Sequence, residues 1–514
     1  MSSPPQLGIL VGETRPDRVH FESKRPISIG EYVVLNYGKG KVLGLIERSQ
    51  VTSDALRAAV RNYDEAFESR QVALENKRDK SYRATVHILG YVEDLKRCKS
   101  VIPDLPPEPG TEVYEATLED LGSIFSSTSA EWIRLGNLLR NPAVGVRVNT
   151  NKVVSRHLAV LAMTGMGKSN LVSLIAKELA RINGTMVIFD YHDDYSTLDM
   201  GSRSNLTDAK INPRFLNADK LAEVIEVHEN ASNQLHVLRT AFTEDVKSRS
   251  GDDFWDALES AAAAVGADRA YREASEKIVD KIDDARRRFR AILDPGLSDP
   301  LALIKNGKIN VVSLIELTEK QANIAVSFYL QELLDDRKKA KGRTVGTRNS
   351  SRIEPRFPAP VLVVLEEAHV FIPKDEKTET KYFASKVARE GRKFGLGLVI
   401  VSQRPRAIDA NILSQMGSFA IMRMIQPDDQ AQISAASESL SRDLMEQLAS
   451  LNPGEAILTG QWVNLPTFAK VDEIKEHRTG SDQNAVQEWQ KLSDIKQLTR
   501  ETADSYVPPG YIQD

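Results

Sequence analysis

Two glycines, a lysine and a serine stand close together in the stretch AMTGMGKSNL, which runs from Ala162 to Leu171. The apolar run HLAVLA leads into this stretch, and an amphipathic run follows it. Glycine permits backbone conformations that let loop amides surround an anion, and the N-terminus of a following helix adds its dipole. The stretch therefore fits the phosphate-loop pattern, with Ala162 in the place of the usual first glycine, where the residue only needs to be small.

The residue types of this loop predict a binding site for ATP and Mg²⁺ rather than a chance match at an unrelated helix start. Lys168 is expected to reach the β- and γ-phosphates, and the hydroxyl of Ser169 is expected to bind Mg²⁺. An apolar strand before the loop and an amphipathic helix after it are the context that such a site needs. The other residues of the loop expected to contact the nucleotide are Thr164, Gly165, Met166, Gly167 and Asn170.

Two adjacent carboxylates, Glu366 and Glu367, end the apolar run VLVVL. Open α/β sheets place their chemistry at the carboxyl ends of their strands. We expect Glu366 to hold the Mg²⁺ shell, usually through water, and Glu367 to act as the general base for the attacking water. Glutamate is unusual at the metal position, where aspartate is more common. A solvated strand end is the alternative interpretation.

Polar residues also follow two other apolar runs. Gln403 comes after LGLVIVS and is expected to contact the γ-phosphate or the attacking water, although a lone glutamine would be surface decoration. In VIFDYHDDY, either Asp190 or Asp194 is a candidate for the metal shell, and the sequence leaves that question open. His192 has no nearby cysteine or second histidine, so the stretch does not predict a zinc site.

A basic group precedes the glutamine strand: Arg389, Arg392 and Lys393 lie in SKVAREGRKFGLG. They are expected to lie across the sheet from the phosphate loop, so they would reach a neighbouring subunit's nucleotide. A guanidinium matches the charge that develops on a γ-phosphate, which suits an arginine finger acting in trans. A basic helix end favoured by its own dipole is the alternative. Arg156, just ahead of the first core strand, is a second candidate for a charge near the nucleotide.

The elements that would position these residues form an α/β fold. Continuous apolar runs predict strands buried on both faces of a mostly parallel sheet, typical of a RecA-like P-loop ATPase core. Short punctuated strands near the N-terminus predict a small β-barrel. The strands are expected at 158–162, 185–190, 309–314, 360–365, 396–402 and 418–424, and the domains at 1–110 (barrel, an interaction domain), 130–475 (core), 215–295 (helical insertion in the core) and 476–514 (C-terminal tail or brace).

Composition narrows the class of protein. A chain of 514 residues is too long for one hydrophobic core. Its net charge of −4 argues against a strongly basic coat but does not exclude a local nucleic-acid site. Cys98 is the single cysteine, so neither an intramolecular disulfide nor a cysteine metal cluster is expected. With no signal peptide and no apolar run long enough to span a bilayer, we expect a soluble, cytoplasmic protein without membrane insertion.

With these residues in hand, the chain resembles the HerA family, within the HerA–FtsK group of motor ATPases. The resemblance rests on NLLRNPAVGVRVNTNKVVSRHLAVLAMTGMGKSN, VIFDYHDDY, VLEEAHVFIP and REGRKFGLGLVIVSQRP, which follow one another in the right order. It implies a HAS-barrel-like N-terminal domain and a homohexameric ring that pumps double-stranded DNA through its pore. It also implies a NurA-type nuclease as partner, in DNA end resection for double-strand break repair.

The resemblance also assigns residues. It makes Arg392 the expected trans finger and Arg156 a second nucleotide-proximal arginine. Residues after the last strand, FAKVDE at 468–473 with Lys470 among them, are expected to close the nucleotide pocket. One departure is the Asp193–Asp194 pair, which stands where the family more often has Gly-Glu, so any metal role of Asp194 rests on a shorter carboxylate.

Two other functions compete with the DNA pump. One is a secretion-type ATPase that moves protein or single-stranded DNA at a membrane, against which the lack of a transmembrane segment and the N-terminal barrel both count. The other is a nucleotide-gated assembly scaffold with vestigial hydrolysis. The intact set of Lys168, Ser169, Glu367 and Gln403 counts against a scaffold.

Overall fold

The computed structural model describes residues 4–56, 60–76, 79–126, 129–198, 200–344, 354–437 and 440–474, together with Val486 and Trp489. Apart from those two residues, the expected tail at 476–514 lies outside the described part of the chain. Within the described residues, no helix is both long enough and apolar enough to cross a bilayer.

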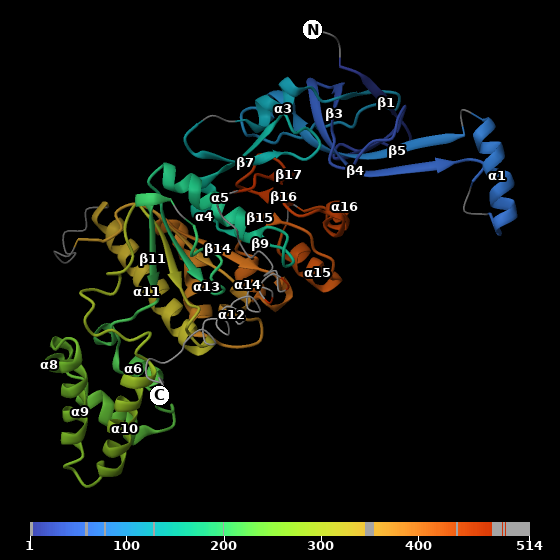
Figure 1. The fold of residues 1–514 in the computed structure, drawn as a ribbon. Helices are drawn as coiled ribbons and strands as arrows, with labels where there is room; N and C mark the ends of the chain where they lie inside the picture. The colour runs from blue at the N-terminus through green and yellow to red at the C-terminus, as the bar shows by residue number, and fades with distance from the viewer. Residues whose placement is uncertain are drawn as a thin grey trace, which may run out of the picture.

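The N-terminal strands close into a six-stranded barrel with the order β1-β2-β5-β4-β3-β6. Alternate side chains fill its interior, as the burial of every second residue of β2 shows. Strands β4 and β5 continue past the barrel as a paired arm that carries α1 at its tip (Figure 1). The elements are β1 (Gln6–Leu10), β2 (Arg18–Ser23), β3 (Tyr32–Tyr37), β4 (Gly40–Ser53), α1 (Tyr63–Glu75), β5 (Lys80–Tyr91), α2 (Val92–Leu95), β6 (Glu112–Glu115) and α3 (Leu118–Phe125).

A second, eleven-stranded sheet forms the centre of the molecule, with the order β11-β12-β10-β13-β14-β9-β15-β16-β17-β7-β8. Every strand from β11 to β15 in that order runs parallel to its neighbour. All six apolar runs predicted as strands from the sequence are strands of this parallel part. They are apolar because these strands are buried on both faces of the sheet. Its strands are β9 (Leu158–Leu161), β10 (Thr185–Asp190), β11 (Ser204–Asp208), β12 (Ile309–Ser313), β13 (Val361–Leu365), β14 (Leu396–Ser402) and β15 (Ser418–Ile421).

Four antiparallel strands extend this sheet toward the barrel, and the sequence did not predict them. They are β7 (Trp132–Leu138), β8 (Gly145–Asn149), β16 (Glu455–Gly460) and β17 (Thr467–Val471). Figure 1 shows β7, β16 and β17 between the barrel and the parallel strands. The Tyr32 hydroxyl donates to the Pro466 carbonyl at 3.3 Å, and Arg140 donates to the Ile29 carbonyl at 2.9 Å, so barrel and sheet are joined directly.

Helices cover the parallel sheet, and a separate group of helices, α6 to α10, is inserted between β11 and β12. In that group, α9 and α10 lie away from the sheet (Figure 1), and α7 packs against both. Ile278, Ile282 and Ala285 are buried on α10. The helices of the group are α6 (Ala218–Val224), α7 (Ser232–Ala241), α8 (Glu244–Ser248), α9 (Asp252–Val265) and α10 (Arg272–Arg288). The others are α4 (Thr150–Arg156), α5 (Lys168–Arg181), α11 (Glu319–Thr344), α12 (Ala368–Phe371), α13 (Glu379–Phe394), α14 (Ala410–Leu413), α15 (Pro427–Ala436) and α16 (Arg442–Gln447).

The predicted fold class is thus confirmed: a closed barrel precedes an α/β core with a mostly parallel sheet and a helical insertion. The three successive arginines of α10 form ion pairs with aspartates of α9 and of α10 itself. The domain boundaries remain predictions.

Candidate active site at the phosphate loop

The phosphate loop leaves the carboxyl end of β9 and turns directly into α5. Gly165 has a φ of 76° and Gly167 a φ of 105°, and both values lie in the left-handed region that favours glycine. Helix α5 begins at Lys168, whose side chain is largely buried at the base of the loop. The loop therefore directs a helix N-terminus and a lysine at one point, the arrangement that binds a nucleotide's phosphates.

The order of the strands brings the other expected groups to the same edge of the sheet. Strand β14 lies between β9 and β13, and all three are parallel, so their carboxyl ends are adjacent. Gln403 follows β14, and its side-chain carbonyl accepts a hydrogen bond from the hydroxyl of Thr164 in the phosphate loop. A glutamine in contact with the loop is not surface decoration, so its place supports the role of a sensor for the nucleotide.

Glu367 lies at the end of β13 in a conformation that an ordinary side chain rarely adopts. Its φ is 46°, and the side chain is buried. Its Oε2 atom lies 3.1 Å from Nδ1 of His369, but it has no hydrogen-bond partner among the described residues. Such backbone strain is common at functional sites, and an unsatisfied carboxylate oxygen is what a general base would use to bind a water molecule.

The charge state of Glu367 suits a base. Burial alone would raise the pKa of its carboxyl, but the interaction with the ring of His369, 3.1 Å away, and the positive charge of Lys168 together outweigh burial, so the pKa lies below its usual value. The carboxyl is therefore ionised at neutral pH. His369 in turn lies 3.3 Å from the hydroxyl of Ser402, so it is held between two strand ends. The sequence contains this histidine in EEAH, but spacing alone gave it no role.

Glu366 has different surroundings from Glu367. Its side chain is fully buried and accepts a hydrogen bond of 2.9 Å from the hydroxyl of Tyr195, which is also fully buried. Burial, strengthened by the negative charges of Glu367 and Asp194, raises the pKa of Glu366 well above its usual range, although the hydrogen bond opposes that shift. Glu366 is therefore a largely neutral, hydrogen-bonded group, and the sequence did not predict its contact with Tyr195.

The two aspartates that follow β10 have separate contacts. Asp190 is buried and accepts hydrogen bonds from the backbone amides of Asp194, at 3.0 Å, and Tyr195, at 2.8 Å. Burial raises the pKa of Asp190 to about 6, although the two amides lower it. Asp194 accepts a hydrogen bond of 2.7 Å from the hydroxyl of Ser169. Asp190 thus holds the loop, while Asp194 touches the residue expected to bind Mg²⁺.

The segment that follows β17 lies against the phosphate loop, where the closing residues of the pocket were expected. Asn170 donates to the carbonyl of Asp472 at 2.9 Å, and its side-chain oxygen accepts from the amide of Ile474 at 3.0 Å. Lys470 donates to the carbonyl of Pro453, and the amide of the next residue, Gly454, donates to Met166 at 2.9 Å. These contacts bring Asn170 and Lys470 to the neighbourhood of the loop.

The two arginines lie at the opposite edge of the sheet. Arg156 is the last residue of α4, just before β9, and Arg392 lies near the end of α13, just before β14. Both strands then run away from the arginines toward the phosphate loop, and β9 alone spans roughly 13 Å. The structure therefore does not bring Arg156 or Arg392 to the phosphate loop of the same chain.

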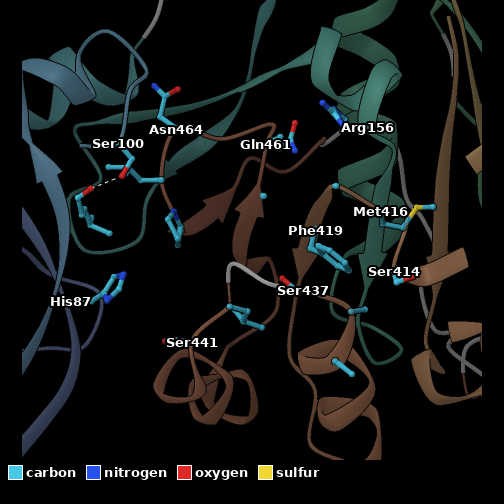
Figure 2. Close-up of a pocket in the computed structure, with 18 of the residues that line it drawn as sticks. His87, Ser100, Arg156, Ser414, Met416, Phe419, Ser437, Ser441, Gln461 and Asn464 are labelled. Carbon is cyan, nitrogen blue, oxygen red and sulfur yellow. Dashed lines mark hydrogen bonds between the residues drawn. The ribbon is translucent and has the colours of Figure 1, made fainter. Parts of the chain in front are cut away.

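The surroundings of the arginines differ. Arg392 is exposed and makes no ion pair with any described residue. Arg156 lies on the wall of a cavity of about 780 Å³ between the barrel and the sheet, with His87 on the far side (Figure 2). The buried ring of His157 connects the start of β9 to α13 and β14. It lies 3.0 Å from the Ala388 carbonyl of α13 and accepts a hydrogen bond of 3.0 Å from the Leu398 amide of β14.

A magnesium ion fits the donor chemistry of this edge. Mg²⁺ prefers oxygen ligands, keeps several waters and is usually held by one or two protein groups together with phosphate oxygens. Ser169, Asp194 and the glutamates supply only oxygen. Among the described residues, no group of three or more His, Cys, Asp or Glu could hold a metal ion.

The phosphate loop follows β9, Gln403 follows the neighbouring strand β14, and the two glutamates follow β13, which is next to β14. This arrangement defines a P-loop ATPase. The fold of VirB4 from Thermoanaerobacter pseudethanolicus is similar to this chain, with a TM-score of 0.51 at 12% identity, covering 68% of this chain and 98% of that one. The model of the HerA helicase central domain matches residues 133–333.

Whole-length relatives place the chain within this class. It is 36% identical to the DNA double-strand break repair helicase HerA of Saccharolobus solfataricus, over 97% of this chain and 98% of that protein. It is 31% identical to the protein of the same name from Pyrococcus furiosus, over 95% of this chain and 97% of that protein. The chain belongs to the HerA helicase family, and it is an ATP-hydrolysing helicase or translocase.

Proposed function

We propose that this chain is an ATP-driven translocase of double-stranded DNA that acts in the cytoplasm, in the end resection that begins double-strand break repair. The observation that carries the proposal is the convergence of the phosphate loop, Glu367 and Gln403 on one edge of a sheet. It occurs in a chain that aligns over nearly its whole length with helicases named for double-strand break repair.

In this proposal the loop binds Mg²⁺–ATP. Lys168 and the loop amides hold the β- and γ-phosphates, and Ser169 binds Mg²⁺, which when bound neutralises charge on the phosphates. Glu367 accepts the proton of the attacking water, and Gln403 senses the γ-phosphate from its contact with Thr164. The nucleotide is further contacted by Thr164, Gly165, Met166, Gly167 and Asn170, with Lys470 closing the pocket.

The active unit in this proposal is a homohexameric ring. Because Arg392 and Arg156 lie across the sheet from their own phosphate loop, they contribute to catalysis only if a neighbouring subunit's nucleotide faces them. The exposed guanidinium of Arg392 is then the trans finger, and Arg156 is the second arginine near that nucleotide. Native mass measurement with and without DNA tests the ring directly, and a monomer under all conditions would count against it.

The barrel is proposed to hold a NurA-type nuclease. Among its described residues, no group of three or more His, Cys, Asp or Glu could hold a metal ion, and its long arm with α1 projects away from the ATPase sheet (Figure 1). A chain lacking residues 1–110 should lose the nuclease in a pull-down while retaining nucleotide binding. Retention of the nuclease at full strength by the truncated chain would refute this docking site.

The DNA contact is expected to be insensitive to sequence, because a pump must hold every register of the duplex equally. Lysines and arginines that contact phosphates would supply the affinity, which should fall steeply as salt rises: a protein that makes 6–10 such contacts loses about 10³–10⁵ in affinity between 50 and 200 mM salt. Fluorescence anisotropy with two unrelated duplexes measures both properties. An affinity that does not respond to salt, or that strongly prefers one duplex, would oppose the translocase function.

A further inference from the structure

The loop after β10 makes two hydrogen bonds near the phosphate loop, and these bonds indicate different roles for Asp194 and Glu366. Consecutive residues of this loop point to different partners: Asp194 accepts a 2.7 Å hydrogen bond from the hydroxyl of Ser169, and Tyr195 donates a 2.9 Å hydrogen bond to Glu366. This short segment therefore places the carboxylate of Asp194 beside Ser169 and supplies the hydrogen bond that Glu366 accepts.

The position of this loop is well defined. Buried Asp190 accepts the amides of Asp194 and Tyr195, so both of its oxygens are used inside the chain. The ring of Tyr195 is fully buried, and Asp193 takes a φ of 64° where the loop turns back. Because Asp190 is also only 1% exposed, we assign it the structural part of holding Asp194 in place.

Contact with Ser169 matters because of what a metal does to a hydroxyl. A hydroxyl that binds Mg²⁺ donates a lone pair of its oxygen to the metal, and its hydrogen then needs an acceptor. Asp194 is that acceptor, and it is only partly buried, so its remaining lone pairs can bind the waters that Mg²⁺ keeps. Glu366 also accepts one hydrogen bond, from the hydroxyl of Tyr195, but it is only 1% exposed, so the waters of the ion reach it less readily than they reach Asp194.

We propose that Asp194, rather than Glu366, is the carboxylate that supports the Mg²⁺ of bound ATP, and that Glu366 is a buried positioning residue that anchors Tyr195 and the loop. This inference rests on the proposed binding of Mg²⁺–ATP at the phosphate loop. It accounts for the glutamate at a position where aspartate is more common, because the metal carboxylate is supplied from the neighbouring strand β10.

The test compares Asp194→Asn with Glu366→Gln, and uses Asp193→Asn as the matched control. Asp193 is an exposed carboxylate in the same loop, and asparagine tolerates its left-handed backbone. For each full-length variant, the affinity for a non-hydrolysable ATP analogue is measured by calorimetry in excess Mg²⁺ and again in EDTA. The ratio of the two affinities reports the metal contribution, independently of turnover.

Asp194→Asn should reduce this ratio by about 10-fold or more, the usual effect of removing a group that supports a metal ligand. Glu366→Gln and Asp193→Asn should keep the ratio within about 3-fold of the unmodified chain. Affinity in EDTA should be similar in all of them, which shows that the loop remains folded. Tyr195→Phe provides a second check, because it removes the bond to Glu366 while Asp190 still holds the loop through the amides of residues 194 and 195, so the ratio should stay within about 3-fold.

Three outcomes would overturn the assignment: an unchanged ratio in Asp194→Asn, a large loss in Glu366→Gln with normal affinity in EDTA, or equal losses in both. A failure of the proposed function would look different. The unmodified chain would then bind no nucleotide either with Mg²⁺ or with EDTA, and the assignment of Asp194 would fall with it.

Discussion

Replacement of Glu367 by glutamine should leave a protein that binds ATP and scarcely hydrolyses it. Glutamine keeps the size of the side chain but cannot accept the proton of the attacking water. General bases contribute about 10²–10⁴ in rate, so turnover should fall within that range while nucleotide affinity persists. Lys168→Ala should differ, because the β- and γ-phosphates lose their main counter-charge and productive ATP binding itself is weakened or lost.

Equilibrium binding of a fluorescent ATP analogue, measured beside single-turnover hydrolysis, separates these two variants. His369→Ala is an informative companion, since it removes the group that lies 3.1 Å from Glu367 without removing the carboxylate. It should raise the pKa of Glu367 and move the acid limb of the pH–rate profile toward higher pH. Hydrolysis by Glu367→Gln at the unmodified rate would show that Glu367 is not the base.

Arg392→Ala should nearly silence the assembled protein while ATP still binds. If Arg392 acts on a neighbour's nucleotide, each active site is built from two subunits, and arginine fingers contribute roughly 10³–10⁵ in rate. Lys393→Ala is a matched control, because it removes an adjacent exposed charge from the same helix. Arg392→Lys should rescue little, since an ammonium cannot reproduce the planar contact of a guanidinium with phosphate.

Mixing inactive subunits makes the test of Arg392 diagnostic. Subunits with Arg392→Ala keep a complete phosphate loop, and subunits with Lys168→Ala keep the finger. Where a Lys168→Ala subunit presents its finger to the intact loop of an Arg392→Ala subunit, hydrolysis should return. A cis or purely structural arginine predicts no recovery at any mixing ratio, in rings whose mixed composition is confirmed by mass.

Sequence patterns predicted six of the seven parallel strands, because those six are buried on both faces and are therefore mostly apolar. They did not predict β7, β8, β16 and β17, which are antiparallel and carry polar residues, such as Arg134 and Lys470, among their apolar ones. β11 was missed because, in an edge strand, Ser204 and Thr207 are not fully buried and no continuous apolar run forms.

The candidate site could be predicted as a set of residues but not as a set of contacts. Order along the chain placed the phosphate loop, Glu366, Glu367 and Gln403 at strand ends, and the strand order brings those ends together. The pairing of Tyr195 with Glu366 spans 171 residues of sequence, and that of Ser169 with Asp194 spans 25, so no local spacing could reveal either. Those contacts distinguish a metal carboxylate from a buried support.

The rate of ATP hydrolysis with and without blunt-ended duplex DNA at low salt tests the central claim most directly, with Glu367→Gln measured in parallel to subtract contaminating activity. A DNA-driven translocase predicts that the rate rises with duplex, saturates, and depends little on its sequence. A rate that is the same with and without DNA, in a protein that binds both ATP and duplex, would contradict the claim that hydrolysis is coupled to DNA movement.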